Sequence, residues 1–424
     1  MHYRFGPLLD SHATTFRLYA PSAGAPLLLL ADREPIPLKA AGGGYWQARI
    51  EGVGEGTRYK FRSGELEFPD LASRQQDGDA SGWSIVRKPL APSDRQGPLR
   101  PWHETVLCEV HVGAATPEGT FAALSHRLEH FRDAGYACLE IMPVHAFPGA
   151  RNWGYDGTLA FAPASTYGSP EHLRALVDHA HELGLCLVLD VVYNHFGDTF
   201  NFARSYVPEW FSDEVKTPWG PGINFENEEV CRFYYENAAM WLSEYDFDGL
   251  RFDSVHEMKT DGRDRFLTGL ADVAHEVKPH AKLIIENMKN SFRWLERDSH
   301  NEPLRYLAQW NDDMHHVLTY LTTRRAGRPD TTIRARIHMR TSRRRLPTAS
   351  CMTPLKVRTV MVAPMGRRRE ATARQFHHLR AESRPDWKSW GLQADCRAGI
   401  AGTNRLHALR KIPCASDPTL LHGR

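Results

Sequence analysis

Short apolar stretches separated by turn-forming residues fill the first part of the chain. Apolar and polar side chains alternate over residues 15–19 and 58–62, and residues 27–30 are four consecutive leucines. Residues 46–50 alternate again directly after three glycines. Such strands at close spacing predict a small immunoglobulin-like β-sandwich over residues 1–95. A module of this kind either binds glycan or braces its neighbour, and the lack of a clear aromatic platform favours bracing.

From about residue 106 the pattern changes to apolar strands that alternate with helical periodicity. The strand patterns cover residues 106–111, 138–143, 185–190, 249–253, 283–286 and 305–309, and the helical patterns cover 121–134, 169–183, 228–245 and 263–277. This alternation predicts an α/β fold, a (β/α)8 TIM-type barrel that is C-terminally incomplete, with about six βα units over residues 96–323. A Rossmann sheet is the alternative, but no Gly-x-Gly-x-x-Gly motif follows any strand.

Composition adds a broad class to this picture. The chain has 424 residues, of which 42% are hydrophobic and 25% charged, as is ordinary for a globular protein. The first residues do not resemble a signal peptide, and no apolar run approaches the ~20 residues of a membrane span. Seven cysteines lack the spacing of a metal site. We therefore expect a cytoplasmic protein without structural disulfides, membrane segment, metal or cofactor.

Charge is distributed very unevenly along the chain. Residues 324–424 contain 23 basic and 6 acidic residues, a net charge of +17, whereas the first 323 residues contain 30 basic and 45 acidic residues, a net charge of −15. One interpretation is a real arginine-rich tail that binds nucleic acid. The arginines show no helical face and no interleaved aromatic residues, so no nucleic-acid partner is expected. The tail is predicted to be either disordered or the product of a frameshift.

Ionisable side chains follow three of the predicted strands at their ends. Asp190 ends one buried strand and His195 continues into its loop, while Arg251 and Asp253 lie two residues apart on another strand and share a face. Glu286 follows three apolar residues. Because parallel barrel strands end at the same rim, these groups are expected to meet there, and two facing carboxylates can hydrolyse a glycosidic bond.

The neighbours of these two carboxylates suggest their roles. Arg251 would keep Asp253 ionised, as a nucleophile requires, and burial would raise the pKa of Glu286 toward that of a general acid. The simpler alternatives are a salt bridge inside the barrel for Asp253 and a water-facing strand end for Glu286.

Three stretches of the sequence resemble the first three conserved regions of the α-amylase superfamily of glycoside hydrolases. They are Asp190 to His195, residues 249–253 and Glu286. The resemblance implies that Asp253 is the nucleophile and Glu286 the acid/base. It also implies that Tyr155, His195 and Arg251 surround the sugar at the cleavage point.

Longer stretches resemble one family within that superfamily, the malto-oligosyltrehalose trehalohydrolases. These stretches are residues 109–113, 116–121, 147–156, 193–197, 217–220 and 309–316. The resemblance implies retaining hydrolysis of the α-1,4 bond beside the terminal trehalose of malto-oligosyltrehalose. It adds His256, Asn311, Asp312 and Asp313 to the substrate-binding residues. Glycogen-branching enzymes share the layout, but the run at 309–316 favours the trehalohydrolases; a non-catalytic glucan-binding remnant is the other alternative.

The superfamily pattern includes a third carboxylate in a His-Asp motif, and no His-Asp pair follows Glu286 in this chain. Residues 381–390, read one nucleotide later, are compatible with Gln-Asn-His-Asp-Gln-Ile-Gly-Asn-Arg, which resembles the trehalohydrolase segment that carries this motif. The His-Asp pair would lie under Arg384 and Pro385. We therefore hypothesise a frameshift near residues 318–324, and we expect weak or absent activity from the chain as printed.

Overall fold

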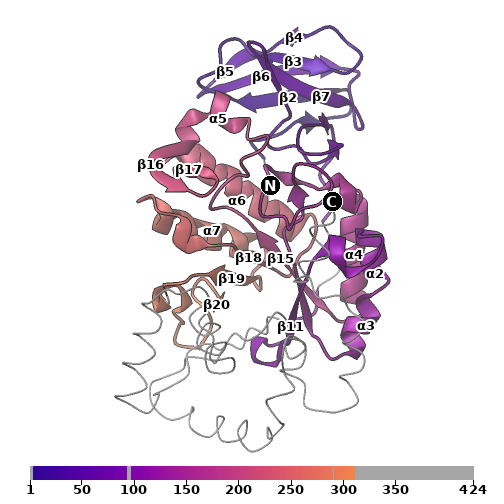
Figure 1. The fold of residues 1–424 in the computed structure, drawn as a ribbon, viewed down its shortest axis with the longest axis vertical. Coiled ribbons are helices and arrows are strands. Elements are labelled where there is room, and N and C mark those ends of the chain that lie inside the picture. The colour runs from indigo at the N-terminus through magenta and orange to yellow at the C-terminus, as the bar shows by residue number, and fades with distance from the viewer. Residues whose placement is uncertain (1–2, 93–96, 290, 311–424) are drawn as a thin grey trace, which may run out of the picture.

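The computed structural model describes residues 3–92, 97–289 and 291–310, which form a β module stacked on a curved parallel sheet with helices against it (Figure 1). The predicted tail at 324–424 lies outside the described residues, as do Asn311, Asp312 and Asp313. Within the described ranges, no helix combines the length and apolar character that a membrane crossing needs.

Two antiparallel sheets make up the N-terminal module, in agreement with the alternating pattern of its sequence. One has the order β1-β2-β6-β5, and the other has the order β4-β3-β7-β10-β9 with β8 beside β7. Phe16, Tyr59, Phe61 and Phe68 fill the space between them and are fully buried. The strands are β1 (Leu8–Leu9), β2 (Ala13–Tyr19), β3 (Leu27–Leu30), β4 (Ile36–Pro37), β5 (Lys39–Gly42), β6 (Tyr45–Glu51), β7 (Arg58–Ser63), β8 (Leu66–Phe68), β9 (Gln76–Asp77) and β10 (Trp83–Ile85).

The second unit is a parallel sheet of six strands in the order β11-β12-β15-β18-β19-β20, which is also their order along the chain. A singly wound, curled sheet of this kind is part of a (β/α)8 barrel and not a doubly wound Rossmann sheet, so the predicted fold is confirmed. Its strands are largely apolar because both of their faces are buried, and the charged residues among them are buried as well or nearly so. The strands are β11 (Leu107–Val110), β12 (Cys138–Ile141), β15 (Cys186–Val191), β18 (Gly249–Phe252), β19 (Lys282–Glu286) and β20 (Ala308–Trp310).

Helices pack on the outer face of this sheet, as Figure 1 shows for α4 and α7. Ser169 caps α4 by accepting from the His172 backbone, with Pro170 at the first helical position, and Asn227 caps α6 by accepting from two backbone N–H groups. The helices are α1 (Val112–Ala115), α2 (Phe121–Ser125), α3 (Leu128–Asp133), α4 (Pro170–Glu182), α5 (Ala203–Tyr206), α6 (Glu228–Ser243) and α7 (Arg263–Val277).

Three details differ from the sequence prediction. The helix expected over residues 121–134 is broken at Arg127 into α2 and α3, which still bury Leu124 and Phe131 on one side. The last strand begins at Ala308 instead of residue 305, because Tyr306 turns inward and donates to the Leu267 carbonyl at 2.7 Å. Two hairpins were not predicted, β13 (His145–Ala146) with β14 (Leu159–Pro163) and β16 (Phe211–Thr217) with β17 (Gly220–Ile223).

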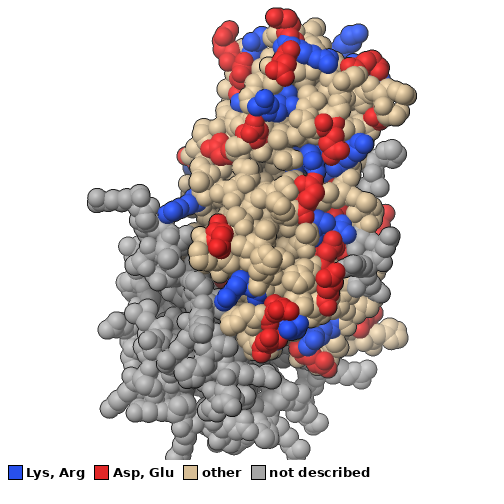
Figure 2. All heavy atoms as spheres, turned by 90° about the vertical axis from the view of Figure 1, so that its right-hand side faces the viewer, with Lys and Arg blue, Asp and Glu red and all other residues tan. Residues whose placement is uncertain are grey.

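The surface of the described part mixes both charge signs. On the face shown in Figure 2, acidic and basic side chains are interspersed along the whole height of the molecule.

The β module is fixed to the barrel unit through the buried carboxylate of Glu244, which follows α6. Its oxygens accept hydrogen bonds from the Tyr3 hydroxyl, the Arg74 guanidinium and the Leu90 backbone. Arg74 is itself almost fully buried. Aromatic rings of the module also pack against Trp210 and Phe233 of the barrel unit. These contacts favour the bracing role over glycan binding for the β module.

Glu244→Ala is therefore expected to destabilise the protein by about 3 kcal/mol, because it leaves the Arg74 charge buried without its partner. Urea unfolding at pH 7 measures this change. Glu51→Ala is the control, because its ion pair with Arg49 is exposed on both sides and should contribute nothing detectable. Equal unfolding midpoints for the two variants would show that Glu244 does not hold the module in place.

Candidate active site

The guanidinium of Arg251, on β18, is the centre of a buried cluster of carboxylates. Its Nη1 donates to both oxygens of Asp190 at 2.8 Å and to Asp253 Oδ1 at 2.8 Å. Its Nη2 donates to Glu286 Oε2 at 2.8 Å. Asp190 on β15 is the register partner of Arg251, so their side chains extend to the same side of the sheet. The three acids predicted at successive strand ends thus meet at one cation.

Burial governs the protonation of this cluster. It raises the pKa of Asp190 to about 7, although Arg251 opposes the shift. It also raises the pKa of Asp253, with the nearby charge of Glu286 adding to the shift while Arg251 and Asn194 oppose it. Arg251 was expected to keep Asp253 ionised. Arg251 does favour the carboxylate, but desolvation outweighs it, because one cation serves several acids in a dry site.

Ser254 is a residue of this site that sequence reasoning missed. Its backbone lies in the left-handed region, with φ 42° and ψ 47°. This conformation is strained for a residue other than glycine, and it turns the backbone N–H toward the acid/base candidate. The N–H donates to Glu286 Oε2 at 3.0 Å, and the hydroxyl donates to the same oxygen at 3.3 Å. No sequence pattern signals such a backbone angle.

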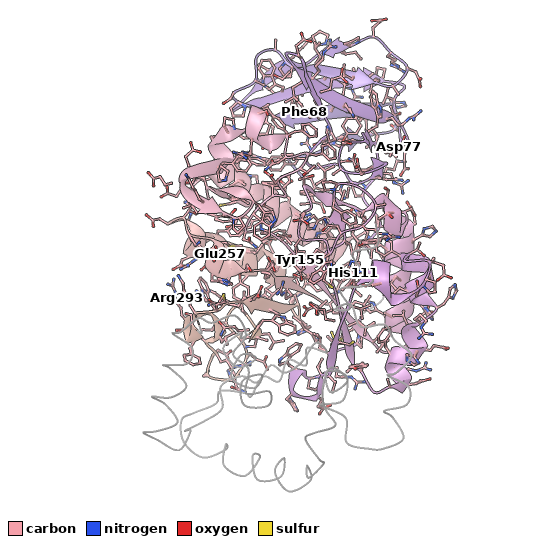
Figure 3. All side chains as sticks on the ribbon, in the orientation of Figure 1. Phe68, Asp77, His111, Tyr155, Glu257 and Arg293 are labelled. Atoms are coloured by element: carbon pink, nitrogen blue, oxygen red, sulfur yellow. The ribbon has the colours of Figure 1, made fainter. Side chains whose placement is uncertain are left out.

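The residues expected around the sugar join the same network. Tyr155 donates from its hydroxyl to Asp190 Oδ2 at 2.9 Å, and Figure 3 places Tyr155 near the middle of the barrel unit. Asn194 Nδ2 donates to both the backbone and the side-chain oxygen of Asp253, each at 2.9 Å. His195 Nε2 lies 2.8 Å from the Tyr155 carbonyl. Burial lowers the pKa of His195 to about 4, so the ring is neutral at pH 7, as expected for a group that bonds hydroxyls.

Trp219, between β16 and β17, covers one face of the His195 ring. The ring centroids are 3.7 Å apart and the planes differ by 14°. Its Nε1 donates to Asp156 Oδ1 at 2.9 Å, and Asn152 donates to the other oxygen of Asp156 at 2.9 Å. Residues 217–220 carry part of the resemblance noted above, but no sequence pattern predicts that Trp219 and His195 stack.

His256 is the remaining predicted residue within the described part. It is buried and lies just after Ser254, and its Nδ1 accepts from the Met288 backbone at 3.4 Å. It therefore lies beside the cluster, next to the turn that carries Ser254. Among the residues that the structure describes, no group of His, Cys, Asp and Glu side chains is arranged to hold a metal ion.

His145 on β13 lies behind this site, against Gly157. A side chain on Gly157 would collide with the His145 ring, so glycine is required there. Burial lowers the pKa of His145 to about 4, and the neighbouring His195 adds to the shift. Between pH 4 and about 6.5 the unfolded chain binds a proton at this position that the folded protein does not, so stability is lost as the pH falls through that window.

His145→Gln is expected to reduce this loss by up to about 3 kcal/mol between pH 6.5 and pH 4. Urea unfolding of both proteins at several pH values in this window measures the effect. His300→Gln, at an exposed position, should leave the pH dependence as it is. An identical acid sensitivity in His145→Gln and the parent would show that His145 is protonated in the folded state as well.

The curled parallel sheet and the carboxylates at its strand ends define a catalytic domain of the α-amylase type. Residues 71–219 match the family described as "Alpha amylase, catalytic domain". A protein titled as an alpha amylase from Salmonella typhimurium has a similar structure, with a TM-score of 0.73 and 34% identity over 77% of this chain and 56% of that one. A pullulanase from Bacillus subtilis shares the fold alone, with a TM-score of 0.59 and 21% identity.

Among curated proteins, the malto-oligosyltrehalose trehalohydrolase of Saccharolobus solfataricus is 36% identical over 333 residues, which are 76% of this chain and 58% of that protein. The trehalohydrolase of Deinococcus radiodurans is 36% identical over 73% of this chain and 51% of its own length. A 1,4-α-glucan branching enzyme from Nocardia farcinica is 28% identical. Residues 71–219 therefore carry an α-amylase catalytic domain, and the chain is a homologue of the malto-oligosyltrehalose trehalohydrolases. It spans about half the length of these curated relatives.

Proposed function

We propose that this catalytic domain acts on an α-1,4-glucan and cleaves the bond beside the terminal trehalose unit of malto-oligosyltrehalose. The observation that carries the proposal is the convergence of Asp190, Asp253 and Glu286 on the single buried cation of Arg251. The similarity to the trehalohydrolases supports this particular substrate.

The proposed mechanism assigns the nucleophile to Asp253 and the acid/base to Glu286. Asp253 would attack the anomeric carbon while Glu286 protonates the departing glycosidic oxygen, and water would then release the sugar as Glu286 takes up its proton. Retaining enzymes hold these carboxyl groups about 5 Å apart. Bonding of both carboxylates to terminal nitrogens of one guanidinium favours such a short separation. Each side chain is 13% exposed, which leaves it open toward a substrate.

Two features of the site would assist this reaction. In this proposal Tyr155 and His195 line the sugar beside Asp190. Hydrogen bonds hold both rings in place, because Tyr155 donates to Asp190 and the two ring nitrogens of His195 lie against Asn194 and the Tyr155 carbonyl. The backbone N–H and hydroxyl of Ser254 bond one oxygen of Glu286, which fixes the orientation of the carboxyl group. A positioned acid requires less reorganisation in the transition state than a mobile one.

The chain as printed is proposed to bind the glucan but to hydrolyse it weakly, because the third superfamily carboxylate has no counterpart in its sequence after Glu286. The frameshift near residues 318–324 remains our explanation for this. Resequencing the gene across codons 315–330 tests it directly. A gene that reads through the printed frame without interruption would contradict the frameshift.

Trehalose release from malto-oligosyltrehalose by the purified chain tests the proposed activity. Slow release that disappears in Glu286→Gln would support a weak trehalohydrolase, whereas turnover at the rate of an intact enzyme would overturn the prediction of weak activity. Formation of new branch points in amylose would instead identify a branching enzyme, the alternative raised by the Nocardia farcinica relative. Glucan binding without any product would identify a non-catalytic remnant.

A further inference from the structure

Phe200 has an unusual combination of backbone strain and exposure. Its φ is 61°, in the left-handed region, where a bulky side chain is a genuine outlier. The ring is nevertheless 36% exposed, so it is not held there to fill the core. Strained positions of this kind persist where the surrounding structure enforces them, and they concentrate at sites that bind or react.

The loop that carries Phe200 leaves directly from the candidate active site. Gly197 donates from its backbone to the Gly157 carbonyl at 2.9 Å, and a side chain on Gly197 would collide with the Asp156 carbonyl. Asp156 is the residue that holds Trp219 over His195. Phe200 follows Gly197 by three residues and therefore lies within about 11 Å of it.

The other end of the loop is also fixed beside the active site. The Arg204 guanidinium of α5 lies 3.2 Å from the position that a side chain on Gly220 would occupy, and Gly220 follows Trp219. Within the loop, the ring of Phe202 is nearly parallel to that of Phe200, with centroids 6.1 Å apart and planes 12° apart. Phe202 packs against the core, so it restricts the orientation of the exposed ring. The loop thus presents an exposed aromatic ring, restricted in orientation by Phe202, between two points fixed near Trp219.

We propose that Phe200 is an aromatic platform for one glucosyl unit of the α-glucan, outside the cleavage point. The proposal rests on the function proposed above and extends it to a further contact. A pyranose ring exposes C–H groups that pack on the face of an aromatic ring, and a ring with restricted orientation loses little entropy on binding.

A protein partner fits this position less well. The preceding Asp198 and Thr199 are both exposed and polar, so Phe200 is a single ring in polar surroundings. A stable protein interface buries roughly 1,200 Å² or more, which one partly exposed ring does not supply. A glucosyl unit matches its size, and the neighbouring polar groups can bond sugar hydroxyls.

Isothermal titration calorimetry of the full chain with maltoheptaose tests the platform without requiring hydrolysis. Phe200→Ala is expected to bind maltoheptaose about five- to tenfold more weakly, whereas Phe200→Tyr keeps the affinity of the parent. Leu8→Ala, at an exposed position on β1, is the control and should bind as the parent does. Equal affinities for the parent and Phe200→Ala would overturn the platform, while no binding by the parent would overturn the proposed function and the platform with it.

A second measurement separates this role from a structural one. Phe200→Gly is expected to lose the same affinity as Phe200→Ala but to unfold at a higher urea concentration than the parent, because glycine adopts the left-handed conformation without strain. Opposite changes in stability and affinity are typical of a residue kept for binding. A large loss of stability in Phe200→Gly would show that the ring serves packing, and would contradict the proposal.

Discussion

Restoring the reading frame near codons 318–324 is expected to raise trehalose release from malto-oligosyltrehalose by about 10³-fold or more over the printed chain. The shifted frame places a His-Asp pair under Arg384 and Pro385, and the superfamily resemblance implies that this acid supports the oxocarbenium-like transition state. Loss of one preorganised electrostatic group typically reduces the rate by about 10²–10³-fold. The same frame would supply the sequence that a complete barrel requires, which adds to the gain.

Chromatographic measurement of trehalose from both proteins, at equal concentration, gives the ratio of rates. Glu286→Gln in the frame-restored protein is the matched control, and it should lower the rate by about 10²–10⁴-fold because the leaving oxygen loses its acid. Similar rates for the restored and printed proteins would show that the residues after the frameshift are not needed for catalysis.

Replacement of Arg251 by methionine is expected to have the largest effect on stability, about 3–5 kcal/mol at pH 7. Methionine preserves much of the volume but leaves Asp190, Asp253 and Glu286 without their shared cation in a buried site. The effect depends on pH. Without the guanidinium the folded-state pKa values of Asp190 and Asp253 rise further, so the folded protein binds protons that the unfolded chain, with carboxyl pKa values near 4, does not.

The stability of Arg251→Met should therefore fall as the pH rises from about 4 through 7, and the variant should approach the parent at the acidic end. Urea unfolding at pH 5 and pH 8 checks this dependence. Arg251→Lys keeps the charge without the planar fork and should be intermediate. Arg58→Met, in a half-exposed ion pair with Asp77, is the control and should not change stability detectably. The same loss at both pH values in Arg251→Met would mean that the carboxyl groups are already protonated in the parent.

The strands of the parallel sheet could be predicted from the sequence, because buried strands consist mainly of apolar residues. Residues 185–189 are a continuous apolar run, and residues 249–252 are fully buried around Arg251, because strands at the middle of a covered parallel sheet are buried on both faces. The β16–β17 hairpin was not predictable, because β16 is rich in polar residues and much of it is exposed, so its pairing leaves no apolar pattern. The break between α2 and α3 was missed for a related reason, since the apolar residues keep helical spacing across it.

The candidate site likewise contains residues whose positions could be predicted from the sequence and residues whose positions could not. Asp190, Arg251, Asp253 and Glu286 were placed together in advance, because strand ends and two-residue spacing determine where they lie. The left-handed Ser254 and the contacts of Trp219 depend on loops whose path no periodicity records. The net rise in the pKa of Asp253 could not be predicted from the sequence either, because it depends on burial and on how many carboxylates share the Arg251 guanidinium in the folded protein.

The agreement between sheet order and chain order has a consequence for biosynthesis. As the polypeptide leaves the ribosome, each barrel strand finds the strand synthesised before it already available as a neighbour. The sheet can therefore grow in one direction during translation, by short-range additions that do not wait for distant sequence. At each stage the most recently synthesised strand forms the edge of the sheet. The strand β18, with Arg251, therefore joins the sheet only after β15, with Asp190, is in place. The guanidinium of Arg251 is therefore synthesised after the carboxylate of Asp190 with which it pairs.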